Sequence, residues 1–347
     1  MIISIISLTT LALFLISATK NVFVTTPLQL DIPKYFPTPS KNIFAKNKIT
    51  EEGFQLGKKL FYDTQLSVDG TTSCGSCHQP FAAFATYDHD FSHGVNNKFS
   101  TRNAPSLVNL AWMSNMHWDG AINNLEVQPL APITDSNEMG ETLPNVLLKL
   151  KKDTSYRHYF KNAFGDATVT TERMLKALAQ FMGTLISANS KYDQVRKGTA
   201  QFIAPEAAGY EIFKQHCNTC HKEPLFTDNS FRNNGMPINK LGDVGRQKIT
   251  QQPSDALKFK VPTLRNVGVT IPYMHDGRML TLELVVNHYT NIDTTLQNLD
   301  PILKKRIQLT EREKKQLILF LYTLTDTSFT RNKRFLPDIV QNFENHR

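Results

Sequence analysis

The sequence contains four cysteines, and their spacing is its most specific chemical signal. They form two Cys-x-x-Cys pairs, each followed at once by histidine: Cys74, Cys77 and His78, then Cys217, Cys220 and His221. Two thiols three positions apart lie on one side of a helical turn, where both can form thioethers with the vinyl groups of a haem. The histidine that follows then directs its imidazole at the iron. The pattern predicts two covalently bound haem c groups, with His78 and His221 as proximal ligands.

Other uses of paired cysteines explain these residues less well. Zinc ribbons place their pairs roughly 15–20 residues apart, whereas these two pairs lie in separate halves of the chain. A thioredoxin-like redox pair needs a single motif in a βαβ setting, which the sequence pattern does not contain. Disulfides would leave both histidines without a role.

The composition is typical of a folded chain large enough for two domains. Its 347 residues are 40% hydrophobic and 20% charged, which excludes a disordered or fibrous protein. The formal net charge is +8, but the basic residues are scattered instead of forming stripes, so we expect no nucleic-acid partner. The excess charge either favours an acidic protein partner or serves only solubility.

The beginning of the chain indicates export. Residues 1–19 are largely apolar, and no charge precedes Lys20. The run is short for a membrane span and suits the hydrophobic region of a secretory signal, although the basic start is missing; an uncleaved N-terminal membrane anchor is the alternative. Either one predicts a periplasmic protein, which agrees with haem c attachment outside the bacterial cytoplasm. Residues 20–48 contain several prolines and predict an extended linker.

The body of the chain repeats itself. Gly57 to Phe61 precedes the first haem motif as Gly209 to Phe213 precedes the second, and an Asp-Gly pair followed by Leu-Glu occurs in each half. The repeat predicts two tandem cytochrome c-type haem domains, at 49–200 and 201–347.

The fold class we predict is mainly α. Apolar residues recur at helical spacing after three capping signals, at Thr50, Thr171 and Thr310. No run is strong enough to predict a sheet. Residues 227–262 predict a long loop over the second haem.

Several sequence blocks between about residues 48 and 330 resemble those of the bacterial di-haem cytochrome c peroxidases, with MauG as a divergent relative. The blocks, in the family's order, are Leu60 to Asp63, Thr101 to Ser106, Trp118 to Gly120, Glu138 with Met139, Pro262 to Asn266 and Tyr273 to Gly277. The resemblance implies two all-α cytochrome c domains whose haems converge on the domain interface.

The resemblance also implies catalytic roles near the first haem, where peroxide reacts in the family. Glu138 matches the general acid–base, and a carboxylate there can take a proton from one peroxide oxygen and return it to the other. Gln128 and Pro132 match other positions of the distal pocket. Trp118 matches the tryptophan that lies between the haems and relays electrons. The family usually has arginine after this Asp-Gly pair, but this chain has Ala121.

The sixth ligand of the second haem separates the subfamilies. Ordinary peroxidases have methionine at the position of Tyr289, where MauG-like proteins have tyrosine. Tyr289 shares an apolar helical face with Leu282, whereas His288 points about 100° away. The alternative is a core tyrosine, with Met274 or Met279 as the ligand. A phenolate oxygen is a hard anionic ligand that stabilises oxidised iron, while a thioether raises the potential.

Two further sites follow from the resemblance. His93 matches a gating histidine that caps the resting first haem, although a plain loop histidine and the competing His89 remain alternatives. Asn103, with the main chain of Thr270 and Pro272, matches a calcium site between the domains, and oxygen ligands suit that ion.

Three functions are consistent with these residues. The first is a peroxidase that reduces hydrogen peroxide with electrons from a small cytochrome or cupredoxin. The second is a MauG-like enzyme that oxidises side chains of a protein substrate through a high-valent two-haem state. The third is a di-haem electron carrier without catalysis, which would require strong ligands on both irons and no role for Glu138.

Overall fold

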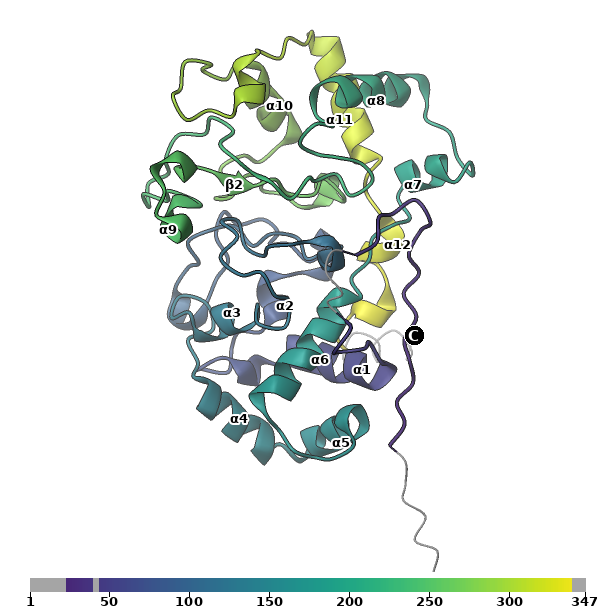
Figure 1. The fold of residues 1–347 in the computed structure, drawn as a ribbon, viewed down its shortest axis with the longest axis vertical. Coiled ribbons are helices and arrows are strands. Elements are labelled where there is room, and N and C mark those ends of the chain that lie inside the picture. Colours follow the sequence, from purple (N-terminus) through teal and green to yellow (C-terminus); the bar gives the residue numbers. More distant parts are fainter. Residues whose placement is uncertain (1–22, 40–43, 339–347) are drawn as a thin grey trace, which may run out of the picture.

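The computed structural model describes residues 23–39 and 44–338, which form two helical lobes stacked on each other (Figure 1). The predicted signal or anchor at residues 1–19 lies outside the described residues. None of the helices in the described ranges is long and apolar enough to cross a membrane.

Helices dominate both halves, as the sequence predicts. Those of the first half are α1 (Glu51–Phe61), α2 (Cys74–Cys77), α3 (Leu130–Thr134), α4 (Leu143–Lys152), α5 (Thr154–Phe164) and α6 (Thr171–Gly183). They are followed by α7 (Lys191–Arg196), α8 (Ala204–His216), α9 (Gln247–Thr250), α10 (Leu282–Thr290), α11 (Glu311–Tyr322) and α12 (Thr327–Thr330). In the described part of the chain the sheet is limited to the antiparallel pair β1 (Phe231–Arg232) and β2 (Phe259–Lys260), both within the predicted loop.

The capping signals place the helices almost where the sequence predicts. Thr50 accepts a hydrogen bond from the Gly53 N–H, and Thr310 forms a reciprocal capping box with Glu313. The prediction that Thr171 caps its helix is wrong. Thr170 is the extended cap residue and its side chain accepts from Arg173 N–H, so Thr171 is the first helical residue.

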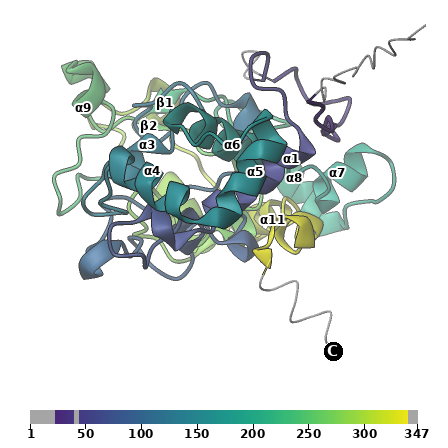
Figure 2. The ribbon, with the colours of Figure 1, turned by 90° about the horizontal axis from the view of Figure 1, so that it is seen from below.

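Each half is built on one crossed helix pair. Helix α1 packs on α6 and α5 in the first half, as Figure 2 shows, and α8 packs on α11 in the second. The repeated glycines explain the close crossing. A Cβ on Gly57 would lie 2.0 Å from the Ala177 carbonyl oxygen, and one on Gly209 would lie 1.9 Å from the Gln316 carbonyl oxygen.

The repeat continues in the loops that face the opposite half. Asn109 and Asn266 both adopt a left-handed conformation before a short 3₁₀ helix. Eight residues later, His117 and Met274 also have positive φ, and each lies in a turn closed by an isolated β-bridge. The two halves therefore share one local fold around their Asp-Gly pairs.

Chain crossings tie the two halves together. The C-terminal Phe329 and Phe335 pack in the core of the first half with Phe54 and Phe84. The N-terminal segment, predicted as a linker, is without helix in its described part and packs Phe36 against Trp112 and Leu225.

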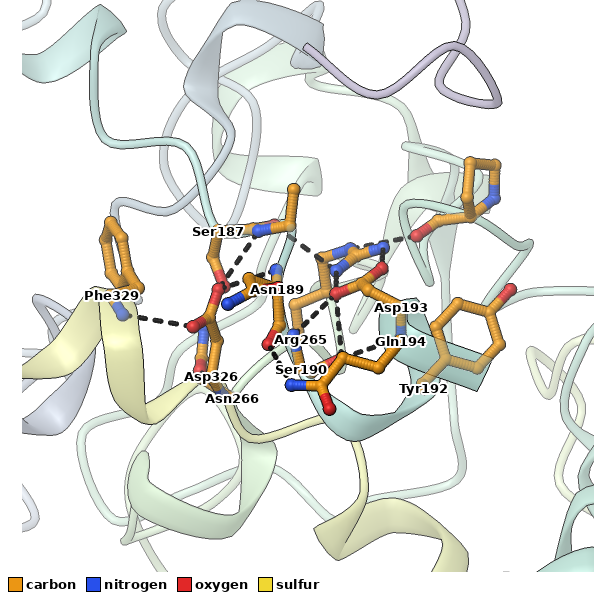
Figure 3. Close-up of polar contacts among 12 residues, drawn as sticks. Ser187, Asn189, Ser190, Tyr192, Asp193, Gln194, Arg265, Asn266, Asp326 and Phe329 are labelled. Carbon is orange, nitrogen blue, oxygen red and sulfur yellow. Dashed lines mark hydrogen bonds and ion pairs between the residues drawn. The ribbon is translucent and has the colours of Figure 1, made fainter. Parts of the chain in front are cut away.

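A buried polar joint lies where the chain passes between the halves (Figure 3). Arg265 forms two 2.9 Å hydrogen bonds to the Asp193 carboxylate, and the two side chains are 1% and 0% exposed. Burial alone would raise the pKa of Asp193, but the Arg265 guanidinium holds it below its usual range. Beside this pair, Asp326 accepts from Ser187 Oγ at 3.1 Å, and Asn266 donates to the same hydroxyl at 2.9 Å.

Asp193→Asn tests the contribution of this joint to stability. The change leaves the Arg265 guanidinium buried without its counter-charge, so we expect the free energy of unfolding to fall by about 3–5 kcal/mol in denaturant titrations. The matched control is Asp166→Asn, which breaks the exposed ion pair with Arg173 and should change little. Similar small losses in both variants would contradict a stabilising role for the buried pair.

Candidate haem and peroxide site

A continuous cavity of about 790 Å³ runs between the two halves. Residues of both Cys-x-x-Cys-His motifs line it, and so does every other site residue predicted from the sequence: Trp118, Gln128, Pro132, Glu138, His93, Tyr289, Asn103, Thr270 and Pro272. Residues far apart in the sequence therefore meet at one site, which is large enough for a bulky cofactor.

The first motif presents a histidine prepared to bind a metal. Cys74 to Cys77 form the single turn of α2, and Ser73 and Ser76 cap it reciprocally. His78 Nδ1 lies 2.8 Å from the Phe84 carbonyl oxygen, and burial lowers the pKa of His78 to about 4. The ring is thus neutral with its proton on Nδ1, which leaves the Nε2 lone pair for the iron.

The second motif has the same arrangement. His221 Nδ1 lies 3.1 Å from the Pro262 carbonyl oxygen and 3.3 Å from that of Phe226, and burial lowers the pKa of this imidazole as well. A carbonyl that fixes the ring tautomer is a common feature of histidines that bind metals.

The cysteines fit thioether attachment better than a metal–thiolate site. Burial raises the pKa of Cys74 to about 12, which disfavours the thiolate form that a metal would bind. Within the described ranges no group of three or more His, Cys, Asp or Glu side chains is placed to hold a metal ion. The donor set and the cavity fit two haem c groups.

Glu138 has the electrostatic character of a proton-transfer residue. It lines the cavity just after α3, in the same region as Gln128 and Pro132. Burial raises the pKa of Glu138 to about 7, and the Asp135 carboxylate adds to the shift. A carboxyl group with this pKa exchanges protons readily at neutral pH.

Trp118 lies on the wall shared by the two motifs. Its indole Nε1 donates a 2.8 Å hydrogen bond to the Asn103 carbonyl, which orients the ring. The nearby Asp119 forms an ion pair with Arg102, which also holds Asp243 of the second half. This chain has Ala121 where the family usually has arginine. Another arginine, Arg246, lies beside this turn, and its Nη1 donates to the Asp119 carbonyl at 3.0 Å.

Tyr289 lines the cavity from α10, as its helical position predicts. Burial raises the pKa of the Tyr289 phenol, although a hydrogen bond from Asn234 opposes the shift. His288 points elsewhere, because its Nε2 is held 2.8 Å from the Asn234 carbonyl oxygen. Met274 also lines the cavity, and its sulfur lies 3.6 Å from Asn234 Nδ2.

His93 and Asn103 have less specific surroundings. His93 is exposed and packs edge-on against His89, with ring centroids 4.8 Å apart. Asn103 donates through Nδ2 to the carbonyls of His89 and Asp90 at 3.3 Å.

Two residues that the sequence pattern did not indicate also line the cavity. His117 Nε2 is buried without a hydrogen-bond partner among the described residues, and Lys260 is a buried cation. Lys260 stands beside the Pro262 to Asn266 block, but nothing in its spacing distinguishes it from a surface lysine.

Comparisons with known proteins identify the family. Residues 51–201 match a family model described as di-haem cytochrome c peroxidase. The chain is 32% identical to the methylamine utilization protein MauG of Methylophilus methylotrophus, over 88% of this chain and 90% of that protein. It is 34% identical to cytochrome c551 peroxidase of Nitrosomonas europaea, over 78% and 79% of the two chains.

A solved structure gives the same result. A MauG-like protein associated with microbial copper homeostasis superimposes with a TM-score of 0.82 and 32% identity, covering 89% of this chain and 99% of that one. The chain therefore belongs to the di-haem cytochrome c peroxidase family, a family of c-type haem oxidoreductases. Its relatives include both peroxidases and MauG.

Covalent attachment at the second motif is tested by replacing Cys217 and Cys220 together with alanine. Because both thioethers are removed, we expect the intact mass of the exported protein to fall by one haem adduct. Haem-stained denaturing gels should show reduced signal, and the wild-type chain should carry two adducts. Two adducts in the double variant would contradict this assignment.

Proposed function

We propose that this protein is a periplasmic peroxidase that reduces hydrogen peroxide to water with electrons from an external redox protein. The domain at 49–200 binds the peroxidatic haem through His78, and the domain at 201–347 binds the second haem through His221. The observation that carries the proposal is the Glu138 carboxyl group, with its raised pKa, in the same cavity as His78.

The reaction consumes two electrons and two protons for each peroxide, and the O–O bond is broken. His78 would hold the haem, and that group would supply the iron at which peroxide is bound and reduced. Glu138 takes the proton from the near peroxide oxygen and delivers it to the departing one, which leaves as water. Gln128 and Pro132 line the same cavity and complete the distal pocket around Glu138.

Trp118 carries charge between the two halves of the cavity. Its indole is fixed by the Asn103 carbonyl, so the ring keeps one orientation during electron transfer. Electrons enter from a small cytochrome or cupredoxin that docks on the second domain, and the net charge of +8 favours an acidic donor.

A second function is favoured by Tyr289. A phenolate from this residue would stabilise the oxidised second haem. That suits a MauG-like enzyme, which removes electrons from side chains of a protein substrate. Burial raises the pKa of the Tyr289 phenol, so the phenol would have to lose its proton on binding iron.

Three further assignments accompany the proposal. His93 gates the first haem in the resting enzyme, since it lines the cavity from an exposed loop. Asn103 and the main chain of Thr270 and Pro272 bind calcium between the domains. An N-terminal signal or anchor directs the chain to the periplasm.

Glu138→Gln tests the peroxidase proposal. The amide cannot accept the peroxide proton, so we expect steady-state turnover with a reduced donor to fall about 10²–10⁴-fold while both haems are retained. Wild-type kcat/KM should rise with pH through about 7, as the Glu138 carboxylate forms, and the variant should lose this rise.

The control is Glu172→Gln, which removes an exposed carboxylate on α6 and should leave turnover unchanged. Full activity of Glu138→Gln would refute the role of this residue. Absence of turnover in the wild type would favour a non-catalytic electron carrier.

Tyr289→Phe separates the two enzymatic functions. If the phenol binds the second iron, its loss should change the absorption and electron paramagnetic resonance spectra of that haem. Tyr322→Phe, an exposed tyrosine on α11, is the matched control and should leave the spectra unchanged. Identical spectra for wild type and Tyr289→Phe would remove the support for MauG-like chemistry.

A further inference from the structure

Lys260 is a buried cation on the wall between the two haem motifs. It belongs to β2, is 8% exposed and lines the cavity. Its Nζ donates to the Asn115 carbonyl at 3.0 Å and lies 3.3 Å from Met113 Sδ. Its backbone N–H donates to the Trp118 carbonyl at 2.7 Å, which fixes it beside the indole.

Among the residues that the structure describes, this ammonium group makes no ion pair. The carboxylate that acts on it is Asp119, whose Oδ2 is held by Arg102 at 2.6 Å and whose Oδ1 accepts the Ala121 N–H at 3.0 Å. Burial lowers the pKa of Lys260 to about 8, against the attraction of Asp119. A buried cation without a partner is costly, so its place in a cavity points to an anion in the molecule that fills the cavity.

The neighbouring Lys258 shows the ordinary arrangement. It lies two positions earlier, and its Nζ forms a 3.1 Å ion pair with Asp255. Lys258 and Lys260 lie on one segment and carry the same charge, so they differ only in their surroundings.

Haem supplies the missing anion, since each porphyrin carries two propionate carboxylates. We propose that Lys260 binds a haem propionate in the gap beside Trp118, and thereby raises the reduction potential of that haem. A cation next to the propionate favours the reduced iron, which carries one positive charge less, and low-dielectric surroundings strengthen the effect. The proposal rests on the haem content of the family and is independent of which substrate the enzyme oxidises or reduces.

Spectroelectrochemical titration of the two-haem protein tests this role. In Lys260→Met we expect the midpoint potential of at least one haem to fall by about 59 mV, which is a tenfold change in the one-electron equilibrium. Lys260→Arg retains the charge and should return the potential close to the wild-type value. Lys258→Met removes a charge from the same segment and should leave both potentials nearly unchanged.

Other results would overturn the proposal. These are equal potentials in wild type and Lys260→Met, equal shifts in Lys260→Met and Lys258→Met, or a failure of Lys260→Arg to restore the potential. Lys260→Met could also lose a haem. Retention of that haem in Lys260→Arg would then support the proposed anchoring, and loss of the haem from both variants would overturn the proposal. Peroxide turnover is not the readout, so failure of the peroxidase proposal leaves this test intact.

Discussion

The cavity between the two halves imposes the main physical constraint on this fold. Side chains of both halves line its wall, so the site is complete only when the two halves keep one relative arrangement. Contacts beside the cavity serve this constraint, and among them Arg265 and Asp193 pair almost without solvent exposure where the chain passes between the halves. Such a pair adds little net stability over apolar packing, but its directional hydrogen bonds fix one relative arrangement of the groups that they join. The proposed electron transfer between the halves requires such a fixed separation.

The crossings of the chain support the same arrangement. Phe329 and Phe335 follow the last long helix of the second half but pack in the core of the first. Opening the cavity would therefore expose these aromatic rings as well as the Arg265 joint, so the cost of separation is partly hydrophobic. Arg102 adds a contact through Asp243, directly at the cavity wall.

Local signals in the sequence were sufficient for the mainly helical fold class and for the helices that begin after Thr50 and Thr310, because each depends on residues a few positions apart. The cap at Thr170 was displaced by one residue because two adjacent threonines both satisfy the pattern, and only backbone conformation distinguishes them. Lys260 and the Arg265–Asp193 pair could not be predicted in the same way. Their roles arise from contacts between distant segments, and a lysine in the sequence carries no indication of its burial or missing partner.

The repeat also indicates how one fold came to present different chemistry on its two sides. Trp118 and His275 occupy equivalent positions in the matching turns, as do His117 and Met274. The backbone is kept while the side chains at the cavity differ, so the first half presents an indole where the second presents an imidazole stacked 3.7 Å from Phe259. Glu138 is likewise confined to the first half, and Tyr289 to the second. A repeated scaffold thus positions both Cys-x-x-Cys-His motifs, and the cavity positions that differ place the proposed proton-transfer residue Glu138 on one side and the proposed iron ligand Tyr289 on the other.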